Sequence, residues 1–418
     1  MKFGRDRWTT LVVILLIAAI PVFCIYEWAR GPRQSAQFLT FPDGSKYRFA
    51  GVSIGTNHLA PVALQRVSSH LPGFLAGFIG KSFGKRFNFA GPERSPAPEL
   101  HIWLEQVEGT GGFVNRRAEQ AVLADDKGTE GSQRVFIQGA HPWLVARFGM
   151  VPRRSRMLEL HFYPMLRGGV ASGPEFGKIK FRNPWYGEYP QWKPETLPAK
   201  RLTGDVEVQL RLAWIGTLPG IPPATRFELQ VSPATNSAAI WAVQRLQVSD
   251  ATGNQLTKEF PGSATQRQFT MDGVFWPDEE ALRLKVFLKR TSGFPGSELL
   301  TFTNVPFPRA FATSGTSLTN HFGGCSLVLR NFAANADYGM GLPSYQYSLD
   351  VLNSPDDLII DFAKVEKDSG GDITNFIRRS RSGNQGLLLE SLPKDAKSLN
   401  ITVSVQKMRS VEFLVKPQ

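Results

Sequence analysis

The chain has 418 residues, which is long enough for two to four domains with their own cores. Its 42 % hydrophobic and 20 % charged residues are ordinary for a globular protein, and Gly and Pro, about a sixth of the chain, favour many turns over long helices. The only two cysteines, Cys24 and Cys325, exclude a cysteine-rich metal site, and the net charge of +12 favours anionic neighbours.

An uncharged apolar segment at 9–26 is about long enough to cross a bilayer as a helix. Trp8 precedes it, and Tyr26 and Trp28 lie at its other end, where aromatic side chains settle at membrane interfaces. Basic residues before the segment favour a cytoplasmic amino terminus. We therefore predict a cytoplasmic tip and a retained transmembrane anchor within 1–30, with the bulk of the chain in the periplasm. A cleaved signal peptide and a buried core helix are the alternatives.

The first predicted domain covers 38–184 and opens with a β-leaning run at 41–55. An insertion at 61–90 is apolar, basic and rich in glycine, which indicates a loop or an irregular short helix packed on the domain. A patch that contacts a membrane surface is the alternative for this insertion. A Pro- and Trp-rich stretch at 184–199 then predicts a connector.

A pattern of a turn, a proline and two strands recurs three times along the chain. The copies have Asp- and Gly-containing turns at 125–128, 250–253 and 368–371, first strands at 158–162, 282–288 and 399–405, and second strands at 177–184, 300–306 and 411–417. Period-2 alternation predicts β-strands, and the second strand should close the edge of each unit. We therefore predict an all-β chain in which three antiparallel, Ig-like β-sandwich domains follow the anchor, at 38–184, 200–309 and 310–418.

Two short motifs suggest chemistry and lack the context that it needs. Residues 51–55 match the G-x-S-x-G pattern of a serine hydrolase, but no amphipathic helix follows Ser53, so a strand of small residues is favoured. The Gly-Lys-Ser run at 80–82 lacks the upstream glycine of a phosphate-binding loop. We therefore predict no catalytic residue and no nucleotide site.

The spacing of residues in the sequence indicates neither a metal site nor a pair of catalytic carboxylates. The six histidines are scattered, at positions 58, 70, 101, 141, 161 and 321, so we predict no metal site and no cofactor. The paired carboxylates of a glycosidase would come from distant positions that a sequence cannot identify. Calcium binding is an alternative for the Asp/Gly turns, but none has enough oxygen ligands, and hairpin turns are favoured.

Trp185, Tyr186, Tyr189 and Trp192 make the connector the densest aromatic group in the chain. If they are buried, they form a wedge between the first two domains; if they are exposed, they form a stacking platform for sugars. The wedge is the favoured interpretation.

Basic clusters are candidate contacts to an anionic surface. They comprise Lys81, Lys85, Arg86, Arg153, Arg154, Arg378, Arg379 and Arg381. Aromatic residues do not interleave with them, and the predicted anchor places them outside the cytoplasm, so we predict no nucleic-acid partner. The expected partners are the cytoplasmic membrane and anionic lipid or envelope polysaccharide.

Three segments carry a resemblance. FPDGSKYRFAGVSIGTNH at 41–58, YPQWKPETLP at 189–198 and LPKDAKSLNITVSVQKMRSVEFLVKP at 392–417 resemble a group of uncharacterised bacterial proteins with an amino-terminal anchor. The resemblance implies a bacterial origin and β architecture, and it transfers no activity and no functional residues.

The favoured function is a non-enzymatic binding or scaffolding role at the cell envelope. A carbohydrate-active or other envelope hydrolase, with acids on sandwich loops, is the alternative. A third class, a membrane-apposed assembly subunit, would be favoured by an exposed apolar face at 61–90. The oligomeric state does not follow from the sequence.

Overall fold

The computed structural model describes residues 37–58, 93–109, 119–136, 143–164, 173–218, 221–234, 238–260, 262–271, 275–276, 278–307, 317–322, 324–332, 345–353, 355, 357–374, 376–381, 384–389 and 395–418. Within those ranges no helix is long and apolar enough to cross a membrane. The predicted anchor at 9–26 and the insertion at 61–90 lie outside them, so both stay predictions.

Every regular element in the described ranges is a β-strand, except for a short 3-10 helix, η1 (Gly296–Glu298). Every pairing between those strands is antiparallel. Apolar and polar residues alternate along these strands, so each strand has one face that packs in a core and one face that points to solvent, as is common in antiparallel sheets. The predicted all-β class with antiparallel sheets is confirmed.

Unit 1 consists of two sheets that face each other across one core. Leu100, Ile102 and Leu104 from one sheet meet Leu160 and Phe162 from the other, all fully buried. The first sheet has the strand order β1 (Phe38–Thr40), β2 (Lys46–His58), β3 (Glu93–Glu108) and β6 (Trp143–Phe148). The second sheet has the order β5 (Glu130–Phe136), β4 (Glu119–Ala124), β7 (Met157–Pro164) and β8 (Gly177–Arg182).

Unit 2 has the same two-sheet construction, with Phe227 and Leu284 from its two sheets in one core. Met150, which follows β6 of unit 1, also packs in this core. The first sheet has the strand order β14 (Gln268–Met271), β11 (Ile221–Pro233), β10 (Val206–Leu218) and β9 (Ala199–Thr203). The second sheet has the order β13 (Gln255–Glu259), β12 (Ile240–Asp250), β15 (Leu282–Ser292) and β24 (Arg409–Val415).

Unit 3 encloses a core in which Tyr347 and Phe362 are the largest fully buried side chains. Burial raises the pKa of the Tyr347 phenol, whose hydroxyl donates to the carbonyl oxygen of Pro306 at 3.4 Å. The smaller sheet has the strand order β16 (Leu299–Pro306), β23 (Ser398–Lys407) and β20 (Leu358–Lys367). The larger sheet has the order β17 (Ser317–Phe322), β18 (Cys325–Phe332), β19 (Tyr345–Leu352), β22 (Asn384–Leu389) and β21 (Phe376–Arg381).

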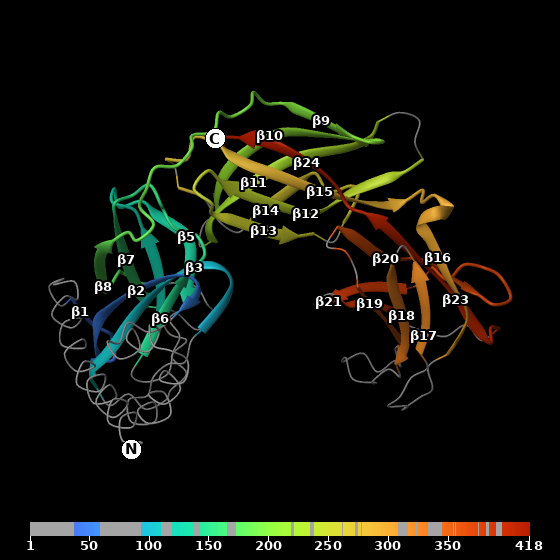
Figure 1. Cartoon of the computed structure of the whole chain (residues 1–418), viewed down its shortest axis with the longest axis horizontal. Coiled ribbons are helices and arrows are strands. Elements are labelled where there is room, and N and C mark those ends of the chain that lie inside the picture. The colour runs from blue at the N-terminus through green and yellow to red at the C-terminus, as the bar shows by residue number, and fades with distance from the viewer. Residues whose placement is uncertain are drawn as a thin grey trace, which may run out of the picture.

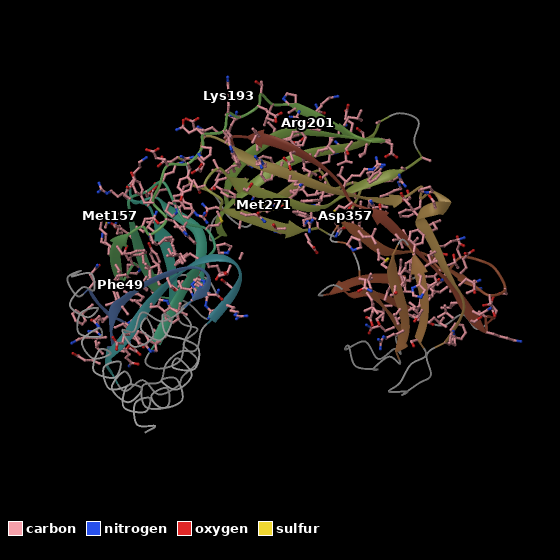
Figure 2. The ribbon with its side chains drawn as sticks, in the orientation of Figure 1. Phe49, Met157, Lys193, Arg201, Met271 and Asp357 are labelled. Atoms are coloured by element: carbon pink, nitrogen blue, oxygen red, sulfur yellow. The ribbon has the colours of Figure 1, made fainter. Side chains whose placement is uncertain are left out.

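The three units form an arch. Unit 2 lies across the top, and units 1 and 3 extend from its two ends toward the same side (Figure 1). Side chains fill the space between the paired sheets of each unit (Figure 2). Each unit therefore has its own core, and the arch depends on the two joints between units.

Each Asp/Gly segment forms a tight turn. The Asp125 carboxylate accepts hydrogen bonds from the backbone N–H groups of Lys127 and Thr129 at 2.9 and 2.7 Å. In the second turn the Asp250 carboxylate accepts from the backbone N–H groups of Thr252 and Asn254. Gly128 and Gly253 have φ of 80° and 95°, a conformation that favours glycine. In the third turn Lys367 occupies the position of Asp125, because its N–H donates to Gly371. The predicted hairpin turns are confirmed.

Units 2 and 3 exchange their last strands. In unit 1 the two strands of the repeat pair directly, β7 with β8. In unit 2, however, β15 pairs with β24 from the third repeat, while β16 pairs with β23 in unit 3. The prediction that 300–306 closes the second sandwich and 411–417 the third is therefore wrong.

The length of one connection explains the exchange. Strand β23 ends at Lys407 and β24 begins at Arg409, so only Met408 separates them. The shortest common hairpin loop has two residues, and β24 therefore does not fold back on β23. It continues into the sheet of unit 2, where Val411, Phe413 and Val415 join the core.

A buried side-chain amide closes the crossing point. Where β24 leaves, the ladder along β15 ends at the Leu288–Arg409 pair. Beyond it, Gln406 Oε1 accepts from the backbone N–H of Arg290 at 2.7 Å, and Gln406 Nε2 donates to the Arg290 carbonyl at 2.9 Å. Gln406 is 3 % exposed. The amide replaces the two hydrogen bonds that a paired strand would have made.

Charged side chains surround the same crossing point. The guanidinium carbons of Arg290 and Arg409 lie 4.9 and 4.6 Å from the centroid of the Trp241 ring. Arg290 donates to Glu298 at 2.7 Å, and both arginines donate to Asp205. Partial burial acts in the opposite direction, but Arg409 lowers the pKa of the Asp205 carboxyl below its ordinary value.

The strand exchange predicts how fragments behave. Residues 310–418 should stay unfolded when expressed alone, because they lack β16, which supplies Phe302 and Val305 to the core of unit 3. The same fragment carries β24 without its partner β15. Residues 294–407 contain every strand of unit 3 and should fold. Circular dichroism and the dispersion of proton spectra measure the difference, and a folded 310–418 fragment would contradict the exchange.

The amide at the crossing point predicts a large effect of one substitution. Gln406→Ala leaves the buried N–H and C=O of Arg290 without these partners, at about 1–3 kcal/mol for each group. We expect the free energy of unfolding to fall by about 2–6 kcal/mol in urea titrations. Gln255→Ala, at an exposed position of β13, is the matched control and should change it by less than about 0.5 kcal/mol. Equal losses in both variants would show that the amide has no special role.

Candidate functional site

The G-x-S-x-G segment at 51–55 lies inside strand β2 and not at a strand-to-helix turn. The interpretation as a strand of small residues is therefore correct, and the segment has no elbow that could present Ser53 to a substrate. The structure gives Ser53 a different environment. It pairs across the ladder with His101, and its hydroxyl lies 3.1 Å from His58 Nδ1.

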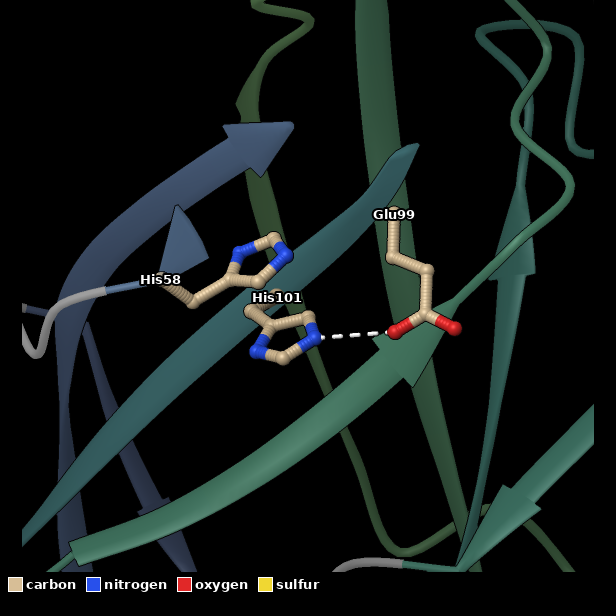
Figure 3. A group of neighbouring side chains, drawn as sticks. All are labelled: His58, Glu99 and His101. Carbon is tan, nitrogen blue, oxygen red and sulfur yellow. Dashed lines mark hydrogen bonds and ion pairs between the residues drawn. The ribbon is translucent and has the colours of Figure 1, made fainter. Parts of the chain in front are cut away.

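His58, Glu99 and His101 meet in unit 1 (Figure 3), on the face of the sheet opposite to the core residues Leu100 and Ile102. One ligand-type atom from each residue lies within 4.8 Å of the other two. His101 Nε2 is 3.0 Å from Glu99 Oε2. Both histidines are fully buried, whereas the Glu99 side chain is 26 % exposed. All three are side-chain types that bind transition metals.

Strand geometry explains this meeting. Glu99 and His101 occupy alternate positions of β3, so they share a face, while Leu100 between them points into the core. The β2–β3 register shifts between Gly55 and Asn57. That irregularity changes the alternation along β2 and returns His58 to the face that carries Ser53.

Hydroxyl groups orient the His58 ring. Ser95 Oγ donates to the Ala97 carbonyl at 2.8 Å, so its oxygen can accept from His58 Nε2 at 3.1 Å. With His58 neutral, Nδ1 then accepts from Ser53 Oγ. Ser53 in turn accepts from Trp103 Nε1 at 2.9 Å. This chain of hydrogen bonds holds the ring from both sides.

The two imidazole rings are stacked, with centroids 3.4 Å apart and planes 7° from parallel. Two imidazolium ions at that distance in a buried site would repel each other strongly. The pair therefore carries at most one positive charge. Such a pair can share one proton with Glu99, or it can bind a cation in place of that proton.

A second histidine group lies on the outer face of the other sheet of unit 1. His161 Nδ1 is 2.8 Å from Glu175 Oε2 and 3.5 Å from Glu130 Oε1. Glu159, 3.5 Å from Nε2, also accepts from Lys180, whose hydrogen bond lowers the Glu159 pKa. Lysine thus neutralises part of this carboxylate group.

The connector aromatics lie in different surroundings. Trp185 packs against the core of unit 1, and the Arg153 guanidinium carbon lies 4.3 Å from its ring centroid. Tyr189 donates from its hydroxyl to the Trp185 carbonyl. The Trp192 ring lies against Arg283 of unit 2, at 4.5 Å. Tyr186 is 51 % exposed, so the four rings do not share one environment.

Arg153 and Arg154 make their polar contacts within the joint between units 1 and 2. Arg153 donates to the Thr252 carbonyl at 2.8 Å, and burial lowers the pKa of its guanidinium. Arg154 donates twice to Glu279, at 2.9 and 3.2 Å. Burial raises the pKa of Glu279, and Arg154 opposes that shift. These two charges are directed at unit 2 rather than at an outside surface.

The same joint contains another amide that binds backbone groups. Asn254 of unit 2 accepts from the Val151 N–H at 2.9 Å and donates to the Val151 carbonyl at 2.8 Å, and both residues are buried. Nearby, Trp276 packs so closely on Gly131 that a Cβ there would lie 2.7 Å from the ring. The joint is therefore closely packed and hydrogen-bonded.

The structure does not test the remaining basic candidates. Lys81, Lys85 and Arg86 lie outside the described residues. Arg378, Arg379 and Arg381 lie on β21, the edge strand of the larger sheet of unit 3. Their contact with an anionic surface stays a prediction.

Sequence reasoning missed the cluster of His58, Glu99 and His101. The two histidines are far apart in the chain, and the insertion at 61–90 separates their strands. The Glu-x-His pattern on one strand face was a signal, but nothing in the sequence indicated which residues of β2 would lie beside it.

The chain matches no protein-family model, and no curated protein matches it. The chemistry of the cluster therefore rests on the geometry described above.

The joint between units 1 and 2 predicts unequal effects of two ion-pair substitutions. Arg154→Ala removes the partner of Glu279, whose side chain is only 6 % exposed, and should cost about 3 kcal/mol. Lys127→Ala removes the exposed partner of Asp278 in the same joint and should have little effect. Differential scanning calorimetry of residues 37–418 measures both. A loss of similar size in the two variants would contradict a role for the buried pair.

Proposed function

We propose that this protein is a membrane-anchored scaffold of the cell envelope, which holds binding surfaces at fixed positions outside the cytoplasm. The observation that carries the proposal is the construction of its two joints. Units 2 and 3 exchange strands, and units 1 and 2 share the Asn254–Val151 and Arg154–Glu279 contacts. Joints of this kind support a fixed arch better than independent modules on flexible linkers.

The finer parts of the proposal come from the sequence. An anchor at 9–26 would attach the arch to the cytoplasmic membrane, and three Ig-like sandwiches would stand in the periplasm. The basic residues Lys81, Lys85 and Arg86 would face anionic lipid or envelope polysaccharide. No enzymatic step is needed for this role.

An envelope hydrolase is the second candidate function, and one observation favours it. Glu130 and Glu175 both approach His161 on the outer face of unit 1. Paired carboxylates are the groups that hydrolyse glycosidic bonds. If this group is catalytic, Glu175→Gln should abolish release of sugar from envelope polysaccharide, while Gln255→Ala should leave it unchanged.

Protease accessibility tests the scaffold proposal. In a bacterial cell that expresses the chain with a carboxy-terminal tag, the tag should fractionate with membranes. It should be digested in spheroplasts that keep a cytoplasmic marker intact. Deletion of residues 1–30 should release the protein from the membrane fraction, because the anchor is lost.

Two outcomes would overturn the topology. One is protection of the tag in intact spheroplasts, and the other is membrane association that survives the deletion. Either result would remove the envelope location on which the scaffold proposal depends.

A further inference from the structure

We propose that His58, Glu99 and His101 form a binding site for a divalent transition-metal ion, with Zn²⁺ as the best fit. This site is independent of the proposed scaffold role. It ties the end of β2 to the middle of β3 at the irregular part of their ladder.

The ligand set and the distances support a metal. Two imidazole nitrogens and one carboxylate oxygen are a known ligand combination of Zn²⁺, and they leave a fourth position open for water or a ligand. In a tetrahedral site with bonds of about 2.1 Å, neighbouring ligand atoms are about 3.4 Å apart. The three groups here have ligand atoms within 4.8 Å of one another, and His101 Nε2 and Glu99 Oε2 are 3.0 Å apart. Rotation of these side chains, including one histidine ring, would bring all three to bonding distance.

Burial and electrostatics support the same conclusion. His58 and His101 are both 0 % exposed, and their rings contact each other face to face. A neutral imidazole is the form that ligates a metal, and the close contact disfavours protonation of both rings. The Glu99 carboxylate adds one negative charge, which offsets part of the charge of a divalent cation.

The hydrogen bonds around His58 supply an outer shell. Metal-bound histidines usually use the second ring nitrogen to bond a neighbouring group, which fixes the ring orientation. Ser53 and Ser95 each lie 3.1 Å from one ring nitrogen of His58. Trp103 and the Ala97 carbonyl hold those serines in turn. One serine can therefore keep its bond while the opposite nitrogen binds the ion.

The stacking predicts a change on binding. A ligand nitrogen binds a metal in the plane of its ring, whereas an ion shared by two parallel rings 3.4 Å apart would lie about half that spacing outside each plane. At least one ring must therefore turn about its Cβ–Cγ bond. Metal binding should open the stack of His58 and His101.

The group around His161 is the appropriate comparison. His161 is also largely buried, at 9 % exposed, and also contacts glutamates. Its neighbour Glu159 is already paired with Lys178 and Lys180, and the described residues around it do not bring three ligand atoms together as the cluster does. His161→Gln is thus a matched control.

Calorimetric titration of the full chain with Zn²⁺ tests the proposal. The protein is purified in detergent with a tag that contains no histidine. We expect the wild-type chain to bind Zn²⁺, and Glu99→Gln and His101→Gln to weaken one site at least about 10-fold. His161→Gln should bind as the wild type does. Co²⁺ in place of Zn²⁺ should give a visible spectrum that both cluster variants lose.

Proton spectra of the histidine rings provide the second readout. Resonances of His58 and His101 should shift on addition of Zn²⁺ because the stack opens, while those of His161 should not. Circular dichroism checks that each variant is folded. If His101→Gln does not fold, Glu99→Gln decides, since Glu99 is partly exposed and its replacement has the same shape.

The proposal is wrong if the wild-type chain takes up no Zn²⁺. It is equally wrong if both folded cluster variants bind Zn²⁺ as the wild type does, or if His161→Gln loses the same site.

Discussion

The arrangement of the three units depends on one recurring interaction: a side-chain amide that bonds both backbone groups of a residue in a neighbouring element. Gln406 binds Arg290 in this way between units 3 and 2, and Asn254 binds Val151 between units 2 and 1. Both pairs are buried, so each amide satisfies polar groups that would otherwise cost stability. Gln406 continues the hydrogen bonding where the β15–β24 ladder ends, and Asn254 joins the turn before β13 to the segment that follows β6.

The strand exchange links units 2 and 3 through two crossings of the chain. Strand β24 follows β23 of unit 3 in the chain and completes unit 2, and β16 follows β15 of unit 2 and completes unit 3. Unit 1 has no such exchange, because β8 pairs with β7 of its own repeat. Its separate character agrees with its two histidine groups, both of which lie on outer sheet faces.

The fold was predictable where the pattern is local. Alternation placed Leu284 and Val286 in a core strand, and Asp125 with Gly128 in a turn, since each depends on near neighbours in the chain. Partner choice was not predictable in the same way. The third repeat reads like the first, because its predicted strands at 399–405 and 411–417 leave room for a hairpin loop, and only the structure shows that Met408 alone separates β23 from β24.

The candidate site shows the same division. The sequence by itself indicated that 51–55 is a strand of small residues; that 93–108 is a strand, whose fixed side-chain period puts Glu99 and His101 on one face, is seen in the structure. Only the tertiary structure decided that His58 lies on the His101 ring. That contact depends on a register and on an irregularity after Gly55, and pairing energies between strands distant in the chain fix both. The alternation of side chains along a strand therefore follows from the local sequence, whereas strand register and strand partners depend on the packing of the whole chain.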